Sequence, residues 1–381
     1  MTMQAQPDAA VPPAWFTEAL AAPVTERMTS QDGVPIAYRM WGGPGGRGIV
    51  LVHGGGAHSR WWDHIAPLLA ADRAVIAIDL SGHGDSGRRA SYSFDAWARE
   101  ILAAVADAWV AEPPVVIGHS MGGIATLRLA SLFGSRIEGA VVIDSPLRDP
   151  APEEQAARRQ RAFRQLRVYP TREAIIARFR PVPDQPVLGY IADHVAATSI
   201  RQVEGGWTWK WDPAVFNNRE VPTAPLSRLE CRAALFRAEH GILSAEMSDR
   251  IYDRLGRVAP VIEIPVAGHH VMLDEPVALV AVLRTLLSDW DHSRPVEARD
   301  PRPYPGWAAA PPDLPINISD LPPPRGPACA PVTFAASPPP RASARPRPRK
   351  PPPRQRSPAP PPEAAGTPRG QAAALPAPLS A

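Results

Sequence analysis

Short runs of consecutive apolar residues recur between residues 26 and 295, and stretches with helical spacing separate most of them. Apolar runs of about five residues are typical of strands buried on both faces of a parallel sheet that helices cover. The runs that we interpret as such strands are 49–52, 73–78, 114–117, 139–143, 232–236 and 261–264. This alternation predicts an α/β fold, with a mostly parallel sheet and helices on both of its faces.

The beginning of the chain has a different pattern. Residues 1–25 have no clear periodicity and are expected to form a loose lead-in. Residues 27–30 and 34–41 read as two strands of a hairpin, because Asp32-Gly33 between them is a strong turn signal. Helical spacing predicts the helices in the segments that follow residue 57 and in residues 94–110, 124–130, 245–255 and 274–290.

The alternation stops at Pro146 and resumes at Arg232. Residues 148–225 are polar, rich in arginine and mainly helical in pattern, and they offer no strand that would extend the sheet. An insertion between two halves of a parallel sheet is typical of a lid. We therefore predict a helical cap over residues 148–225, placed between two core halves, 26–147 and 226–295.

Residues 296–381 differ from the rest in composition, with 26 prolines in 86 residues. Such a segment buries too little apolar surface to offset chain entropy, so we predict a disordered tail. It carries 11 Arg and Lys against 5 Asp and Glu, so the positive net charge of the whole chain, +3, comes from the tail. We therefore do not expect nucleic acid as a partner of the folded body, although the basic 345–351 segment has the composition to contact nucleic acid, acidic surfaces or a polyproline-binding domain.

Neither a membrane span nor a signal peptide is expected. No run of about 18 apolar residues occurs, and residues 1–22 lack a basic start followed by an apolar core. The two cysteines, Cys231 and Cys329, form neither a disulfide framework nor a metal-binding motif. The expectation is a cytoplasmic protein. The sequence does not indicate an oligomeric state.

The stretch 118–123, Gly-His-Ser-Met-Gly-Gly, lies between a predicted strand and a predicted helix. A small-x-Ser-x-Gly turn in that context is a nucleophile elbow, in which glycines allow a sharp turn that exposes the serine hydroxyl at the edge of the sheet. Ser120 is therefore the candidate nucleophile. A serine hydroxyl reacts only when a base takes its proton and a third group holds that base.

The base is expected in a loop after a late strand, and Gly268-His269-His270 follows the run 261–264 directly. A glycine-histidine pair with a proline seven residues later resembles the late motif of the α/β-hydrolase superfamily, and His269 with Pro276 fits it. The resemblance covers about residues 25–292. It implies that His269 is the base, and it leaves His270 as a packing or pocket-lining residue.

The same resemblance implies an oxyanion hole made of two backbone amides, those of Met121 and Gly55. Gly55 belongs to His53-Gly54-Gly55-Gly56, which follows the run 49–52. The resemblance gives His53 a structural role in this turn. The segment 79–87 is similar to another turn of the family and is interpreted as structural.

Two carboxylates are candidates for the third group, the one that holds the base. Most members of the superfamily place the acid after the strand that follows the cap, but Gly241 occupies that position and Glu239 is out of register. Some members take it from the end of the strand next to the elbow strand, about two dozen residues past the nucleophile. Asp144 lies 24 residues after Ser120, at the end of the run 139–143. We predict Asp144, with Glu239 as the alternative.

Tryptophans are the candidate substrate-binding residues. Trp207, Trp209 and Trp211 occupy alternate positions, so in an extended chain they would line one face, either of a pocket or of the cap's own core. Trp61, just after the predicted oxyanion loop, is open to the same two interpretations. His58, His64, His83 and His240 lack metal-ligand spacing, and we expect neither a metal nor a cofactor.

Together these features predict a serine hydrolase that acts on a small-molecule substrate, with a carboxylic ester as the most general class. A carbon–carbon bond hydrolase of ring-cleavage products would use the same three side chains. A protein that senses a small ligand on the same fold, with little or no turnover, is the alternative from another class. A serine at position 120 argues against dehalogenases and epoxide hydrolases, which in this superfamily normally use a carboxylate nucleophile.

Overall fold

The computed structural model describes residues 11–43, 46–108, 110, 112–147, 166–216 and 229–293. These residues all belong to one compact unit, Met1–Arg299. The predicted tail at 296–381, and the parts of the predicted cap at 148–165 and 217–225, lie outside the described residues. No helix among the described residues is long and apolar enough to cross a membrane.

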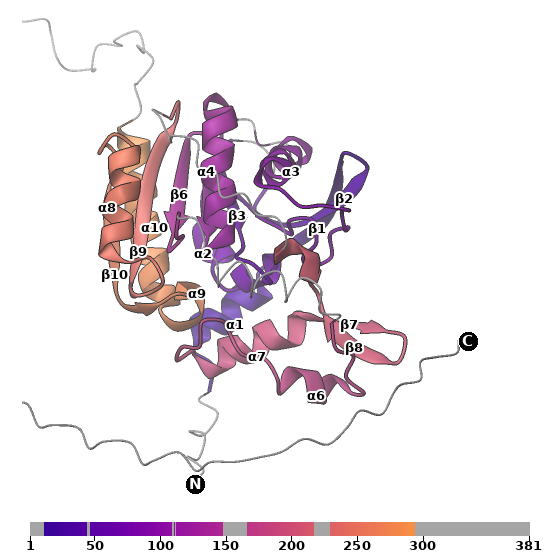
Figure 1. Ribbon diagram of the computed structural model, residues 1–381. Helices are drawn as coiled ribbons and strands as arrows, with labels where there is room; N and C mark the ends of the chain where they lie inside the picture. The colour runs from indigo at the N-terminus through magenta and orange to yellow at the C-terminus, as the bar shows by residue number, and fades with distance from the viewer. Residues whose placement is uncertain are drawn as a thin grey trace, which may run out of the picture. The chain divides into compact units, whose positions relative to one another are not determined.

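An eight-stranded sheet forms the centre of the unit (Figure 1). Its order is β1-β2-β4-β3-β5-β6-β9-β10; the β1–β2 and β2–β4 pairs are antiparallel, and every other pair is parallel. The strands are β1 (Thr25–Gln31), β2 (Val34–Trp41), β3 (Gly48–Val52), β4 (Ala74–Ile78), β5 (Val115–His119), β6 (Gly139–Ile143), β9 (Arg232–His240) and β10 (Val261–Gly268). The predicted mostly parallel α/β sheet is confirmed.

Helices cover both faces of this sheet (Figure 1). One apolar core packs α3 (Phe94–Asp107), α4 (Met121–Phe133) and α8 (Ala245–Arg254) against one face. The other core packs α1 (Ala14–Ala21), α2 (Ala66–Leu69) and α10 (Pro276–His292) against the opposite face. The residues of β3, β4, β5 and β6 are all buried, because side chains pointing either way meet a helical layer.

Local sequence explains several element boundaries. Asp32 and Gly33 both have positive φ, 51° and 75°, which is the conformation that a two-residue hairpin turn between β1 and β2 requires. The side chain of Ser93 accepts a hydrogen bond from the backbone amide of Ala96 and so caps α3.

Some boundaries differ from the sequence-based expectation. Residues 14–21 form α1 rather than part of a loose lead-in, because Phe16 and Ala19 are buried against the sheet's helical layer. The single helix expected after residue 57 is divided into the 3₁₀ turn η1 (Ser59–Trp62) and α2, with Pro67 in the first turn of α2. The strands β9 and β10 extend four residues further than their apolar runs.

The described part of the predicted cap, residues 166–216, contains helices and a hairpin. Its helices are α6 (Arg172–Ile176), α7 (Gly189–Thr198) and the 3₁₀ turn η3 (Pro213–Phe216), and its strands are β7 (Ile200–Val203) and β8 (Gly206–Trp209). The hairpin of β7 and β8 is a separate antiparallel pair, outside the large sheet.

Hydrogen bonds attach this segment to the core. The ring Nε2 of His58 lies 2.8 Å from Ser199 Oγ, and His194 Nε2 lies 3.0 Å from the carboxylate of Asp63. The backbone amide of Gly84 donates to the carbonyl of Lys210 at 2.7 Å. These contacts hold α7 and the β7–β8 hairpin against the loops that follow β3 and β4, at the carboxyl edge of the parallel strands.

Candidate active site

Ser120 occupies a sharp turn between β5 and α4, as the elbow motif predicts. Its φ of 53° and ψ of −117° lie in a region that non-glycine residues rarely adopt, so the surrounding packing must hold it there. That packing is close: a side chain on Gly122 would press into the carbonyl oxygens of Val52 and His53, and one on Gly123 into Ser145. Ser120 remains half-buried, within reach of solvent.

His269 lies directly beside Ser120, although 149 positions separate them in the sequence. It follows β10, and its Nε2 is 3.1 Å from Ser120 Oγ. Its Nδ1 is 2.7 Å from Oδ2 of Asp144. A neutral imidazole donates from Nδ1 to this carboxylate and accepts the serine proton at Nε2, which is the arrangement that general-base activation of a hydroxyl requires.

Asp144 lies at the end of β6 and is fully buried. Its φ of 42° is also positive, so the chain turns sharply where the carboxylate is presented. Besides His269, the carboxylate accepts hydrogen bonds from the backbone amides of Ile242 at 2.8 Å and Leu243 at 3.3 Å. These donors fix the carboxylate in place and compensate its charge in the protein interior.

Glu239, the alternative acid, lies elsewhere. It is exposed, and its carboxylate accepts a hydrogen bond from the amide of Val266 at 2.7 Å. Gly241, at the position where most of the superfamily carries the acid, directly faces the Asp144 carboxylate: a Cβ at residue 241 would lie 2.5 Å from Asp144 Cγ. The absence of a side chain at 241 leaves the space that the Asp144 carboxylate occupies.

The two residues predicted for the oxyanion hole lie close together. A Cβ built on Gly55 would be 3.6 Å from Sδ of Met121, so the loop after β3 approaches the first residue of α4. The same position would be 3.2 Å from the ring of Phe216, which belongs to η3. Phe216, which no sequence motif indicated, therefore lies over the loop that carries Gly55.

Two further histidines surround His269. The ring centroids of His119 and His270 lie 4.6 and 4.7 Å from that of His269. Burial lowers the pKa of His119 well below its ordinary value, and burial together with His269 lowers that of His270 to about 3, so both rings are neutral near pH 7. One ring nitrogen each of His119, His269 and His270 lies close enough to the others for the three residues to hold a metal ion. The spacing of histidines in the sequence did not indicate this group.

Hydrogen bonds at Gly268 and His270 fix the loop that carries His269. The amide of Gly268 donates to the carboxylate of Asp274 at 2.6 Å, and burial raises the pKa of that carboxyl to about 6. The side chain of Gln185, from the segment 166–216, donates to Asp274 at 2.8 Å and accepts from the amide of His270 at 2.8 Å. Gln185 thus links this segment to the histidine loop.

The candidate tryptophans have different surroundings. Trp61 is buried, and its ring centroid lies 5.5 Å from that of His270 and 6.1 Å from that of Phe179. Trp209 lies 6.3 Å from Phe179, so Trp61, Phe179 and Trp209 form a continuous aromatic row that ends beside His270. Trp211 packs edge-on against Phe216 at 5.3 Å, whereas the backbone of Trp207 pairs with Tyr169.

His53 and the turn at 79–87 make structural contacts. Nε2 of His53 accepts from the amide of Leu80 at 3.1 Å, and its Nδ1 lies 2.7 Å from the carbonyl oxygen of Gly54. The carboxylate of Asp79 accepts from the amides of Ser59 at 2.6 Å and Asp85 at 2.8 Å. These bonds connect the loop after β3 with the loop after β4.

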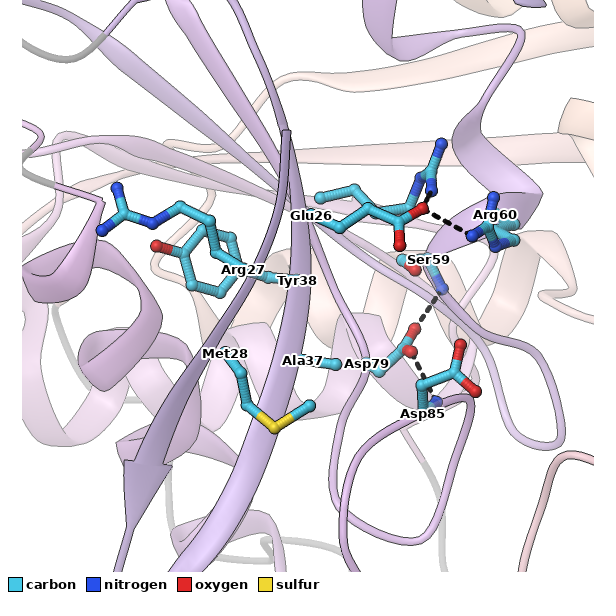
Figure 2. Close-up of a pocket in the computed structure, with 10 residues that line it drawn as sticks. Glu26, Arg27, Met28, Ala37, Tyr38, Ser59, Arg60, Asp79 and Asp85 are labelled. Carbon is cyan, nitrogen blue, oxygen red and sulfur yellow. Dashed lines mark hydrogen bonds and ion pairs between the residues drawn. The ribbon is translucent and has the colours of Figure 1, made fainter. Parts of the chain in front are cut away.

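Ser120 is not among the residues that line two hollows in the surface of the described residues. One, of about 240 Å³, lies at β1 and β2 and is lined mainly by charged and polar side chains, among them Glu26, Arg60 and Asp79 (Figure 2). In it Arg39 and Arg60 both bond the carboxylate of Glu26. The other, of about 470 Å³, is lined by residues 184–188, 240, 266, 268, 274 and 275, and so reaches the loop before His269.

The chain belongs to the alpha/beta hydrolase family, whose sequence model matches residues 49–283. Among characterised proteins it is similar to the esterase Rv0045c of Mycobacterium tuberculosis, with 24% identity over 279 residues that cover 70% of this chain and 90% of that protein. It is also similar to a serine hydrolase-like protein of Danio rerio, with 24% identity over 294 residues, which cover 68% and 89% of the two chains.

Solved structures agree on the fold. The structure of E-2-(acetamidomethylene)succinate hydrolase superimposes with a TM-score of 0.59 and 20% identity, covering 70% of this chain and all of that one. This likeness supports the α/β-hydrolase architecture that the sheet order defines.

Proposed function

We propose that this protein is a serine hydrolase that cleaves small carboxylic esters through an acyl-enzyme, with Ser120 as nucleophile, His269 as base and Asp144 as the acid that orients it. The observation that carries the proposal is the unbroken hydrogen-bonded chain from Ser120 Oγ through His269 to the buried Asp144 carboxylate. The esterase and serine hydrolase-like relatives support the same chemistry.

In the first half of the reaction, Ser120 Oγ attacks the ester carbonyl while His269 Nε2 takes the hydroxyl proton. The backbone amides of Gly55 and Met121 would stabilise the negative charge that develops on the carbonyl oxygen; loss of one such donor typically costs about 100- to 1,000-fold in kcat. His269 then gives the proton to the departing alcohol. Asp144 stabilises the imidazolium without taking its proton.

In the second half, water takes the place of the alcohol. His269 removes a proton from this water, and the resulting hydroxide attacks the acyl carbon. The tetrahedral intermediate collapses to release a carboxylic acid, and the proton on His269 returns to Ser120. The cycle needs only the side chains already named, together with water.

The described cap segment supplies the proposed walls for the acyl or alcohol group. Phe216 lies over the Gly55 loop, and the aromatic row of Trp61, Phe179 and Trp209 ends beside His270. Aromatic walls favour apolar substituents on the substrate, because burying apolar area gains about 25 cal/mol per Å². We infer that Trp61, Trp209 and Trp211 contribute to substrate binding, and that Trp207 acts through the packing of the hairpin.

The test is hydrolysis of p-nitrophenyl esters with acyl chains from acetate to octanoate, and of a ring-cleavage dienoate, by wild-type protein and by Ser120→Ala. Ester turnover that falls by at least about 10⁴-fold in Ser120→Ala supports the proposal. Ser288→Ala, at an exposed serine on α10, is the matched control and should behave as wild type. Cleavage of the dienoate with poor ester turnover would assign a carbon–carbon bond hydrolase instead, and binding without turnover would assign a ligand sensor.

A further inference from the structure

Three histidine rings meet beside Ser120, and one ring nitrogen of each lies within 4.8 Å of the others. His119 is the last residue of β5, whereas His269 and His270 follow β10. All three are buried, with 1%, 4% and 7% of their surface exposed. Hydrolysis as proposed above uses only one of these rings, so the presence of the other two needs an explanation.

Hydrogen bonds set the tautomer of each ring. Nδ1 of His269 faces the Asp144 carboxylate at 2.7 Å, Nε2 of His119 faces the carbonyl oxygen of His269 at 2.8 Å, and Nε2 of His270 faces the carbonyl oxygen of Val182 at 3.1 Å. A nitrogen that faces such an oxygen carries the proton. The lone pairs therefore lie on Nε2 of His269 and on Nδ1 of His119 and His270.

This pattern is the one found around metal-binding histidines, which almost always donate their second N–H to a carboxylate or a backbone carbonyl. Nδ1 of His270 is buried and has no hydrogen-bond partner among the described residues. A buried acceptor without a partner costs free energy, and a bound cation would remove that cost.

We propose that His119, His269 and His270 bind a divalent transition metal ion such as Zn²⁺, and that the bound ion inhibits hydrolysis reversibly. The inhibitory part rests on the proposed function, because the ion would occupy Nε2 of His269, the atom that must accept the proton of Ser120. Ser120 Oγ, 3.1 Å from that nitrogen, or a water molecule completes a four-coordinate site.

The chemistry of the ligands selects the class of ion. Imidazole ligands suit Zn²⁺, Cu²⁺ and Ni²⁺, whereas Mg²⁺ prefers oxygen ligands. Zinc–nitrogen bonds of about 2.0–2.1 Å place tetrahedral ligands about 3.3 Å apart, so nitrogens now up to 4.8 Å apart must close by about 1.5 Å or less. The proposal therefore requires the three side chains to rotate by this amount when the ion binds.

The test measures metal binding directly, without relying on turnover. Titration calorimetry with Zn²⁺ is carried out on the wild-type protein, on Ser120→Ala and on His270→Phe, with Mg²⁺ as the ion that should not bind. His64→Phe is the matched control: His64 is also fully buried, with one ring nitrogen 2.7 Å from the carbonyl oxygen of Met272 and the other without a partner among the described residues. Far-UV circular dichroism checks that each variant is folded.

We expect one Zn²⁺ per chain in wild type, Ser120→Ala and His64→Phe. In His270→Phe the affinity should fall by at least about 100-fold, since loss of an outer-shell partner alone costs 10- to 100-fold. Absence of stoichiometric binding at about 100 µM Zn²⁺, or equal affinity in His270→Phe, would overturn the proposal. If His270→Phe does not fold, Cu²⁺ bound to wild type should give an electron paramagnetic resonance spectrum split by three nitrogens, and a spectrum without nitrogen splitting would contradict the site.

Inhibition is the second readout. Zn²⁺ should abolish ester hydrolysis with a midpoint equal to the calorimetric dissociation constant, and a chelator should restore it. Zn²⁺ that binds the wild type but leaves turnover unchanged would refute inhibition through His269 while retaining the metal site. A protein that hydrolyses no ester but binds Zn²⁺ through His270 would refute the proposed function alone.

Discussion

Gly241 and Asp144 share one space: a Cβ on Gly241 would lie 2.5 Å from Cγ of the Asp144 carboxyl group. The Asp144 carboxylate, at the end of β6, thus occupies the place of the acid that most members of the superfamily carry elsewhere. In those members the acid follows the strand after the cap. Only one of the two positions can carry an acid in this geometry. Substitutions at Asp144 and Glu239 can therefore test which of the two carboxylates acts as the acid beside His269.

Asp144→Asn should lower kcat for ester hydrolysis by about 10⁴-fold, the loss expected when the imidazole loses the partner that sets its tautomer. Glu239→Gln should leave kcat within about threefold of wild type, because Glu239 is exposed and bonds the amide of Val266. Steady-state kinetics on one ester compares the two variants. A larger loss in Glu239→Gln than in Asp144→Asn would reverse the assignment.

Gly241→Ala should displace the Asp144 carboxylate, because the added methyl group has no room beside it. We expect kcat to fall by at least tenfold and the free energy of unfolding by about 1–3 kcal/mol, the usual cost of overpacking. Gly189→Ala is the control: a Cβ there meets nothing within 4 Å, at the first residue of α7. Wild-type activity in Gly241→Ala would show that the carboxylate does not need its present position.

The strands that are buried on both faces could be predicted from the sequence. Runs such as 49–52 and 139–143 are apolar throughout because both faces of β3 and β6 are covered, so their composition revealed them. α1 was missed because only Phe16 and Ala19 of its eight residues are buried, which leaves too weak a pattern. The end of β9 was missed because Arg237 and Glu239 interrupt its apolar run, and the end of β10 because its pairing with β9 shifts register between Ile264 and Gly268.

The position of Ser120 could be predicted because a local motif defines it, and His269 because a glycine before it and a proline after it mark its loop. The structure brings Ser120, His269 and Asp144 together, while their catalytic roles stay a prediction. His119 and His270 could not be found as partners, since their contact depends on where β10 ends relative to β5, across three other strand pairs. Phe216 was missed because its contact with the Gly55 loop joins η3 to a segment far away in the sequence.

The pH dependence of stability follows from the buried histidines. Burial lowers the pKa of His64 from 6.5 to about 4, so the folded state keeps this ring neutral where the unfolded chain protonates it. His64 therefore has no effect on the free energy of unfolding above pH 6.5, and it destabilises the folded state as the pH falls from there toward 4, by up to about 1.4 kcal/mol per pH unit. The melting temperature should fall over this range.

His64→Gln should reduce that slope, because glutamine can donate to the carbonyl oxygen of Met272 but does not titrate. Thermal melts at pH 7.5, 6, 5 and 4.5 compare the variant with wild type and with His292→Gln, in which an exposed histidine is replaced. The His292 control should keep the wild-type slope. An equal slope in His64→Gln would show that His64 does not contribute to acid destabilisation.

We propose that His269 and Asp144 make Ser120 the reactive nucleophile. The most direct measurement is labelling with a fluorophosphonate, followed by mass spectrometry of tryptic peptides. We expect one adduct per chain on Ser120, no labelling of Ser120→Ala, and strongly slowed labelling of His269→Ala. An adduct on another residue, or equal labelling of Ser120→Ala, would contradict it.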